Sequence, residues 1–278
     1  MPLTHIFVLA LIQGITEFLP VSSSAHLIFP SQLLGWADQG LAFDVAVHIG
    51  TLLAVIIYYF SDLVKIAVAV IKSVLERKNT PESRVGWFIV LATIPAGLCG
   101  FLFEDKVASV ARSIHVIAYT TIGFGLLLGL ASLVNRKFCW GSVVNMDERS
   151  DSLRKLTLGQ TIVIGLSQAL ALIPGTSRSG ITMTAGLFLG LRPEAAARFS
   201  FLLSIPIILA SGLLEGIKII KYPDLNAAPL EIFVGVFISF ITAIVVIHCF
   251  LKYISKSGMA VFVIYRLILG ALLLYIIS

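Results

Sequence analysis

Long apolar segments alternate with short polar loops along most of the chain. Six of these segments are long enough to stand alone, and they cover about residues 43–60, 85–103, 115–134, 199–217, 231–251 and 259–277. A helix that crosses a membrane needs about 20 consecutive, mostly apolar residues. We therefore predict six transmembrane helices.

Two further apolar regions, 2–34 and 158–191, are interrupted by polar residues at Pro20 and Pro174. Each half of an interrupted region is only about ten to sixteen residues long, which is too short to cross a membrane. Proline breaks a helix, and broken backbone is tolerated at membrane depth only inside protein or beside a wet cavity. We predict two re-entrant helical hairpins that enter the membrane and return to the same side.

The predicted order is hairpin, three spans, hairpin, three spans. An odd number of crossings in each half inverts the second half relative to the first, and inverted repeats with broken helices are a known membrane architecture. The prediction is an all-α polytopic membrane protein with an inverted repeat. It forms a single integral membrane domain over 1–278, with repeats at about 1–134 and 158–278 and a cytoplasmic connector at 135–157. An alternative is eight or more simple spans without a repeat.

Composition and charge agree with a membrane location. The chain is 58% hydrophobic and 13% charged, whereas a soluble domain has roughly 25% charged residues. Fourteen lysines and arginines fall in predicted loops on one side and four on the other. Basic loops face the cytoplasm, so both termini and the first hairpin are predicted outside. The net charge of +5 therefore reflects topology, and we expect no nucleic-acid partner.

The first hairpin carries a carboxylate, serines and a histidine around its break. Gln13 and Glu17 share a helix face, and Glu17 is suited to hold a divalent cation or to act as a base. The three serines at 22–24 open the next segment, where hydroxyls and free N–H groups bind phosphate. His26 follows within one turn and could activate a hydroxyl or protonate a leaving group. Three serines alone are usually a helix cap.

The second hairpin carries an arginine among hydroxyls. Arg178 lies between Ser177 and Ser179, after Gly175 and before Thr182. A guanidinium matches phosphate oxygens bidentately, and glycine lets the backbone approach an anion closely. We predict a phosphate site here. Asp44, His48 and Arg266 are weaker candidates. Arg266 needs an acid or a carbonyl as its partner, and a structural ion pair is the role we expect for it.

The two polar stretches resemble the two signatures of the undecaprenyl-diphosphate phosphatases, membrane enzymes associated with bacitracin resistance. The first signature, (E/Q)xxxE leading into LPVSSxxH, is matched from Gln13 through Glu17 to His26 in QGITEFLPVSSSAH. The second, PGxSRSGxT, is matched by PGTSRSGIT at 174–182. The similarity continues to the Tyr265-Arg266 pair and covers essentially the whole chain.

The resemblance implies hydrolysis of a C55 polyprenyl diphosphate to its monophosphate with release of inorganic phosphate, which recycles the lipid carrier for cell-wall polymers. It also implies a divalent metal, Mg²⁺ or Ca²⁺, and a site that opens to the outer side of the bacterial cytoplasmic (inner) membrane. This sequence departs from many relatives at Gln13, where they have Glu. Glu17 would then carry more of the metal binding.

The resulting hypothesis assigns three groups of residues. The catalytic residues are Glu17, Ser23, His26 and Arg178; the substrate-binding residues are Ser22, Ser24, Gly175, Ser177, Ser179 and Thr182; and the metal ligands are Glu17 and Gln13. The partners are the polyprenyl diphosphate and membrane lipids. Three alternatives stay open: attack by serine or by water, a monomer or a homodimer, and transport of an anionic lipid in place of hydrolysis.

Overall fold

The structure is a computed structural model that describes residues 1–110, 113–138, 152–221 and 227–277. Every element within these ranges is helical, which confirms the predicted all-α class. The α-helices are α1 (Leu3–Thr16), α2 (Ser23–Leu34), α3 (Leu41–Tyr58), α4 (Phe60–Leu75), α5 (Pro81–Val110), α6 (Ile114–Phe138), α7 (Leu158–Ala169), α8 (Arg178–Phe188), α9 (Pro193–Lys221), α10 (Pro229–Ser257) and α11 (Ala260–Ile277). Two short 3₁₀ helices are η2 (Ser152–Lys155) and η3 (Leu170–Leu172). Most of the predicted connector, 139–151, lies outside the described residues.

Within the described ranges, six helices are long and apolar enough to cross a membrane: α3, α5 as far as Phe103, α6, α9, α10 and α11. They coincide with the six predicted spans, and the chain is a multi-pass membrane protein. Several helices extend past the predicted limits, as α9 does from Pro193 to Lys221 around the predicted 199–217. Hydropathy marks the apolar centre of a helix, whereas charged residues can continue the same helix beyond it.

Both interrupted regions fold as pairs of short helices. In the first, α1 ends at Thr16 and α2 begins at Ser23. In the second, α7 passes through η3 and α8 begins at Arg178. The breaks therefore lie at Pro20 and Pro174, as predicted, and neither region is a continuous span. Within each pair the two helices pack against one another.

Helix α4 was not predicted, because its residues were assigned to a cytoplasmic loop. The charges of Asp62, Lys65 and Lys72 lower its hydropathy below that of a span, but its residues still form four turns of helix. Its inner face packs on α5, where Gly86 leaves room for Val70. An apolar stripe on another face is exposed and includes Val64, Val68, Ile71 and Leu75.

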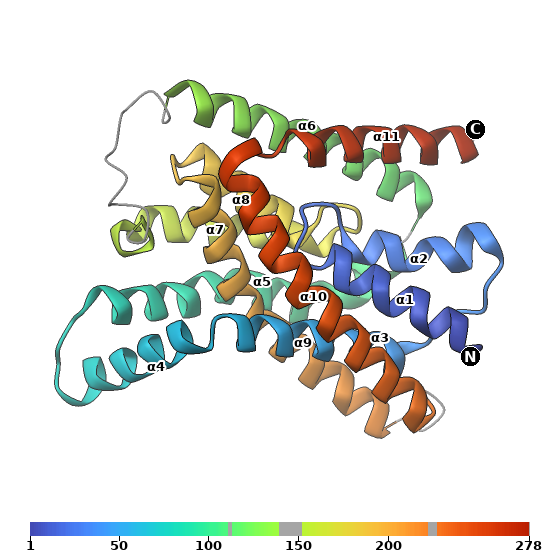
Figure 1. Cartoon of the computed structure of the whole chain (residues 1–278), viewed down its shortest axis with the longest axis horizontal. Helices are drawn as coiled ribbons and strands as arrows, with labels where there is room; N and C mark the ends of the chain where they lie inside the picture. The colour runs from blue at the N-terminus through green and yellow to red at the C-terminus, as the bar shows by residue number, and fades with distance from the viewer. Residues whose placement is uncertain (111–112, 139–151, 222–226, 278) are drawn as a thin grey trace.

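The two hairpins reach the centre of the molecule between longer helices (Figure 1). Helix α1 packs along α10, and α7 packs along α5. In an inverted repeat, α1 would correspond to α7 and α5 to α10, so the packing of α1 on α10 would correspond to that of α7 on α5. The repeat itself stays a prediction. Figure 1 shows the N-terminus and the end of α11 at the right-hand end, opposite the turn that joins α4 to α5.

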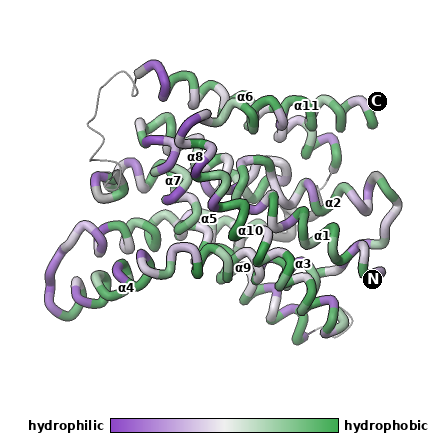
Figure 2. Tube along the Cα trace, in the orientation of Figure 1, coloured by the Kyte–Doolittle hydropathy of each residue, from purple (hydrophilic) through white to green (hydrophobic). Residues whose placement is uncertain are grey.

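Apolar residues cover the outside of the helices as well as the interior, and Figure 2 shows hydrophilic positions gathered at the α4–α5 turn. The largest core cluster lies directly behind the hairpin breaks. Phe18 follows Glu17 in the chain, and its ring meets that of Phe201 edge to face at 5.1 Å between centroids. Both rings are fully buried, so apolar packing fixes the position of the polar residues beside them.

Candidate active site

Each hairpin break ends in a serine with a left-handed backbone. Ser22 has φ 74° and precedes α2, and Ser177 has φ 70° and precedes α8. The Ser177 hydroxyl accepts a hydrogen bond from the Gly180 N–H at 3.1 Å. Both helices thus begin at the centre of the molecule, where their N-terminal N–H groups and dipoles favour an anion.

Glu17 joins the two hairpins. Arg178 Nη2 donates to its Oε1 atom at 2.9 Å, across 161 residues of sequence. Ser23 Oγ donates to Oε2 at 2.8 Å, and Gln13 Nε2 donates to the same oxygen at 3.1 Å. The structure therefore brings together Glu17, Ser23 and Arg178, which were predicted from separate stretches. The Glu17 side chain is only 7% exposed, and all of these interactions are partly or fully shielded from solvent.

Further hydrogen bonds fix the second hairpin. Ser179 Oγ donates to the Leu19 carbonyl at 2.8 Å, which ties α8 to the first break. Arg178 Nη1 donates to the Ser200 carbonyl at 2.9 Å. Thr182 Oγ1 donates to Ser200 Oγ at 2.8 Å. Ser179 and Thr182 are thus committed to contacts between elements.

A cavity of about 180 Å³ lies between the two breaks. Its polar wall includes six predicted residues together with a histidine from α3, and apolar side chains from α9 complete it. The lining residues are Glu17, Ser22, Ser23, Ser24, His48, Ala171, Ser177, Arg178, Ile207, Ile208 and Ser211. One carboxylate, one guanidinium and five serine hydroxyls, four of them at two helix N-termini, suit a phosphate group, and the adjoining isoleucines suit an apolar chain.

His26 does not line this cavity. Its Nδ1 atom is 2.7 Å from the Ser22 carbonyl, and its Nε2 atom is 2.6 Å from the Tyr265 hydroxyl. A carbonyl only accepts hydrogen bonds, so Nδ1 carries the hydrogen and Nε2 accepts from tyrosine. Both ring nitrogens are therefore engaged. In this geometry His26 supports the left-handed turn at Ser22.

His48 is the cavity residue that the sequence analysis ranked too low. Its Nδ1 atom is 2.7 Å from the Asp44 carbonyl, so Nδ1 carries a hydrogen and donates it to that oxygen. Nε2 is 3.8 Å from Glu17 Oε2. The Asp44 carboxylate instead accepts from Gln39 at 2.9 Å. Only the spacing of Asp44 and His48 signalled a polar helix face, and nothing local indicated that Glu17 lies opposite it.

Arg266 is completely buried, and carbonyls, one of the two kinds of partner expected for it, bind it in place of the favoured ion pair. All five guanidinium hydrogen bonds go to main-chain carbonyls: Nε to Thr121, Nη1 to Pro20 and Thr176, and Nη2 to Thr120 and Gly175. At the two helix breaks, main-chain carbonyls lack the N–H donors that a continuous helix would provide. One arginine with five donors satisfies carbonyls from both breaks and from α6.

Gly175 lies away from the cavity, although it was predicted to approach substrate. It has φ 86°, and a Cβ atom there would lie 2.2 Å from Thr120 Oγ1 and 2.7 Å from the Ile117 carbonyl. Thr120 Oγ1 also donates to the Pro174 carbonyl at 2.7 Å. The glycine is therefore needed so that the second break can pack closely against α6.

The oxygen atoms beside Glu17 fit a divalent cation in part. Gln13 Oε1 is buried and has no hydrogen-bond partner within the described part of the chain. Within those residues, however, no group of three or more His, Cys, Asp or Glu side chains could hold a metal. Mg²⁺ is commonly bound through one or two carboxylates together with substrate phosphates. Glu17 fits that mode from the cavity wall, whereas Gln13 lies behind it and does not line the cavity, so the two do not form a complete cage alone.

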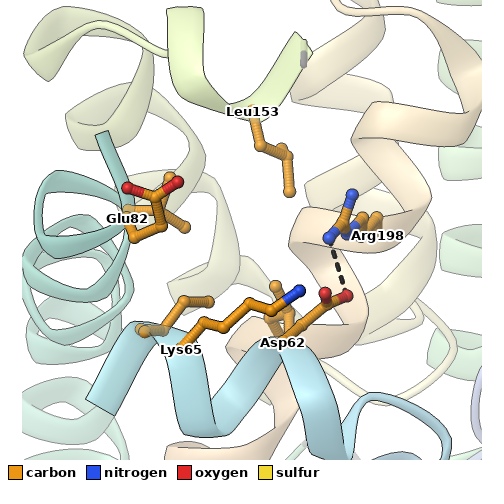
Figure 3. A pocket seen from close by; sticks show the side chains of 8 residues that line it. Asp62, Lys65, Glu82, Leu153 and Arg198 are labelled. Carbon is orange, nitrogen blue, oxygen red and sulfur yellow. Dashed lines mark hydrogen bonds and ion pairs between the residues drawn. The ribbon is translucent and has the colours of Figure 1, made fainter. Parts of the chain in front are cut away.

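A second cavity, of about 110 Å³, is lined by charged residues from α4, α5 and α9. Arg198 Nη2 donates to Asp62 Oδ2 at 2.6 Å (Figure 3). Figure 3 also shows Lys65 pointing toward Asp62, with Leu153 above the ion pair. This cavity contains no serine, and neither helix break contributes to its lining. The cavity between the two breaks, which Glu17, Arg178 and the predicted serines line, is the candidate active site.

Comparison with known proteins identifies close relatives. The family model described as "Bacitracin resistance protein BacA" matches residues 6–272. The undecaprenyl-diphosphatase of Teredinibacter turnerae is 51% identical over 276 residues, covering 98% of each chain. That of Hahella chejuensis is 52% identical over 270 residues, covering 97% of this chain and 96% of the relative. That of Alteromonas mediterranea is 49% identical over 277 residues, covering 100% of this chain and 99% of the relative.

Proposed function

The chain belongs to the family of bacitracin resistance protein BacA, and from this premise we propose that it hydrolyses undecaprenyl diphosphate to undecaprenyl phosphate and inorganic phosphate. The observation that carries the proposal is the meeting of Glu17, Ser23 and Arg178 at one cavity between the two helix breaks. Because the three come from two distant stretches, the fold itself assembles them. A hydrolase of this kind recycles the lipid carrier and supports resistance to bacitracin.

The diphosphate lies in the cavity with its prenyl chain along Ile207 and Ile208. Arg178 and the N-termini of α2 and α8 bind the oxygens of the terminal phosphate. Phosphoryl transfer depends mainly on positioning and on neutralising charge. A divalent cation, Mg²⁺ or Ca²⁺, supplies further positive charge to the phosphates, with Glu17 and Gln13 as its protein ligands.

Ser23 is the nucleophile that the geometry favours. Its hydroxyl already donates to Glu17 Oε2 at 2.8 Å, so the hydrogen can pass to that oxygen as the new O–P bond forms. The bond between the terminal phosphorus and the bridging oxygen breaks, and its electron pair leaves with undecaprenyl phosphate. Water then attacks the phosphoserine, which releases inorganic phosphate and returns the hydrogen to Ser23. Direct attack by water held at Ser23 is the alternative.

We propose that the protein lies in the bacterial inner membrane, with the cavity open to the outer side and both termini outside. The asymmetry of the basic loops supports this orientation. The position of both ends of the chain opposite the α4–α5 turn agrees with it (Figure 1). Substrate would then be drawn from the outer leaflet.

The test is release of inorganic phosphate from undecaprenyl diphosphate by the purified protein in detergent, in the presence of Mg²⁺ or Ca²⁺. Ser23→Ala should abolish release. The matched control is Ser31→Ala, because Ser31 lies on the same helix, donates to the Ile28 carbonyl and lies outside the cavity. Wild-type protein that binds the lipid but releases no phosphate would favour transport over hydrolysis.

A further inference from the structure

The two charged groups of the candidate site neutralise one another in this structure. Arg178 Nη2 is 2.9 Å from Glu17 Oε1, and their side chains are 14% and 7% exposed. Yet the proposed function assigns them to opposite partners, since Arg178 binds phosphate and Glu17 binds a cation. Neither partner can bind fully until the ion pair opens.

The carboxylate of Glu17 has little capacity left for a cation. Oε2 accepts from Ser23 and Gln13, and Oε1 accepts from Arg178. The other nearby oxygen without a partner is the neutral Gln13 Oε1. A divalent cation at Glu17 would also lie close to the Arg178 guanidinium, and like charges at short range repel strongly in a shielded site. The empty site is therefore poorly suited to bind a cation.

Binding of the diphosphate gives Arg178 a new partner and thereby changes how well Glu17 can bind a cation. Phosphate oxygens offer the guanidinium an alternative and more highly charged acceptor. Once Arg178 turns to phosphate, Glu17 Oε1 loses its only donor among the described residues, and the phosphate adds its own oxygens for the cation. Binding of the diphosphate thus creates the cation site.

We propose that the Glu17–Arg178 ion pair couples the two ligands: the diphosphate takes Arg178 and releases Glu17 to the divalent cation, so that each ligand strengthens binding of the other. This inference rests on the proposed function. Coupling of binding free energies is reciprocal, so the cation must raise the affinity for the diphosphate by the same factor. The cation enters with the substrate and does not reside in the empty protein.

Gln13 reinforces this behaviour. Its Nε2 donates to Glu17 Oε2 at 3.1 Å, and it contributes no negative charge. A glutamate at 13 would place a second carboxylate beside the first, and two adjacent carboxylates favour a bound cation. Gln13→Glu should therefore raise the cation affinity of the empty protein.

The experiment measures Mn²⁺ binding by electron paramagnetic resonance, in purified protein without any phosphate ligand. Arg178→Gln should bind Mn²⁺ at least about tenfold more tightly than wild type, which lies within the usual range of coupling between sites, although it should lose catalysis. Arg178→Lys keeps the positive charge and should stay close to wild type. Arg198→Gln is the matched control, since it opens an ion pair in the other cavity and should leave Mn²⁺ affinity unchanged.

A second measurement does not depend on how well the arginine variant folds. If Glu17 is blocked in the empty protein, Glu17→Gln should weaken Mn²⁺ binding less than threefold; a loss of tenfold or more would overturn the proposal. A prenyl methylenediphosphonate, which has no cleavable bridge, should bind wild type at least about tenfold more tightly with Ca²⁺ than with chelator. Equal affinities would also overturn it. Phosphate release by wild type, measured separately, shows whether the proposed function stands in either case.

Discussion

Replacing Arg266 should damage both stability and catalysis, although this residue lies outside the cavity. Its five hydrogen bonds hold carbonyls from the first break, the second break and α6. Arg266→Met removes every donor and deprives the buried carbonyls of the two breaks, at Pro20, Gly175 and Thr176, of this partner. Arg266→Lys keeps the charge but offers three donors from a single atom, which cannot span the same carbonyls.

The expected loss of stability follows from the number of bonds. Hydrogen bonds between helices in membranes average about 0.6 kcal/mol, so five contribute about 3 kcal/mol. Buried polar groups left unpaired cost more, about 1–3 kcal/mol each. We therefore expect Arg266→Met to lower the free energy of unfolding by at least about 3 kcal/mol. At about 2–4 °C per kcal/mol for a chain of roughly this size, the melting temperature should fall by about 6–12 °C.

Catalysis should fall because the two breaks lose their relative position. A misplacement of about 1 Å can cost about 10²-fold in rate. Phosphate release measured well below the melting temperature should show a loss mainly in kcat for Arg266→Lys, with KM changed less than threefold. A melting temperature within 2 °C of wild type and kcat within twofold, for either variant, would refute the assignment of Arg266 as a positioning residue.

Three further substitutions test other parts of the site. Arg178→Lys should lower phosphate release by about 10²-fold, the scale of a lost transition-state donor; near-normal release would contradict a bidentate role. Gly175→Ala should lower the free energy of unfolding by about 1–3 kcal/mol through backbone strain alone, and by more because the new Cβ atom clashes with Thr120. Thermal denaturation in detergent measures this loss. Tyr265→Phe should cost about 1 kcal/mol by removing the donor to His26 and lower kcat only a few-fold; a complete loss of activity would assign the tyrosine a direct role in the reaction.

Much of the fold followed from physical limits that a sequence displays. Apolar length identifies spans, because a bilayer has a fixed thickness. Pro20 and Pro174 identified the breaks, since polar residues around a proline at membrane depth need protein or water beside them. The same cost of burying charge pointed to Glu17 and Arg178. The ion pair between them could be expected once both breaks were assigned to the same place.

Other features were missed, one because hydropathy alone was followed and the rest because they depend on packing that no local pattern encodes. Helix α4 was missed because its charges mask an apolar stripe that period alone reveals. His48 faces Glu17 only because α3 passes beside the first break, and His26 turns away because Tyr265 and the Ser22 carbonyl engage its ring. For Arg266 the sequence left an acid or a carbonyl partner open and favoured an ion pair, whereas carbonyls from the two breaks and from α6 bind it.

The most direct test of the account compares wild type with Glu17→Ala in release of inorganic phosphate from undecaprenyl diphosphate, with Ca²⁺ or Mg²⁺ and then with chelator. We predict release by wild type that depends on the cation and is lost in the variant, while binding of the lipid persists. Release by Glu17→Ala at the wild-type rate, or release that chelator leaves unchanged, would contradict a reaction carried out between the two hairpins.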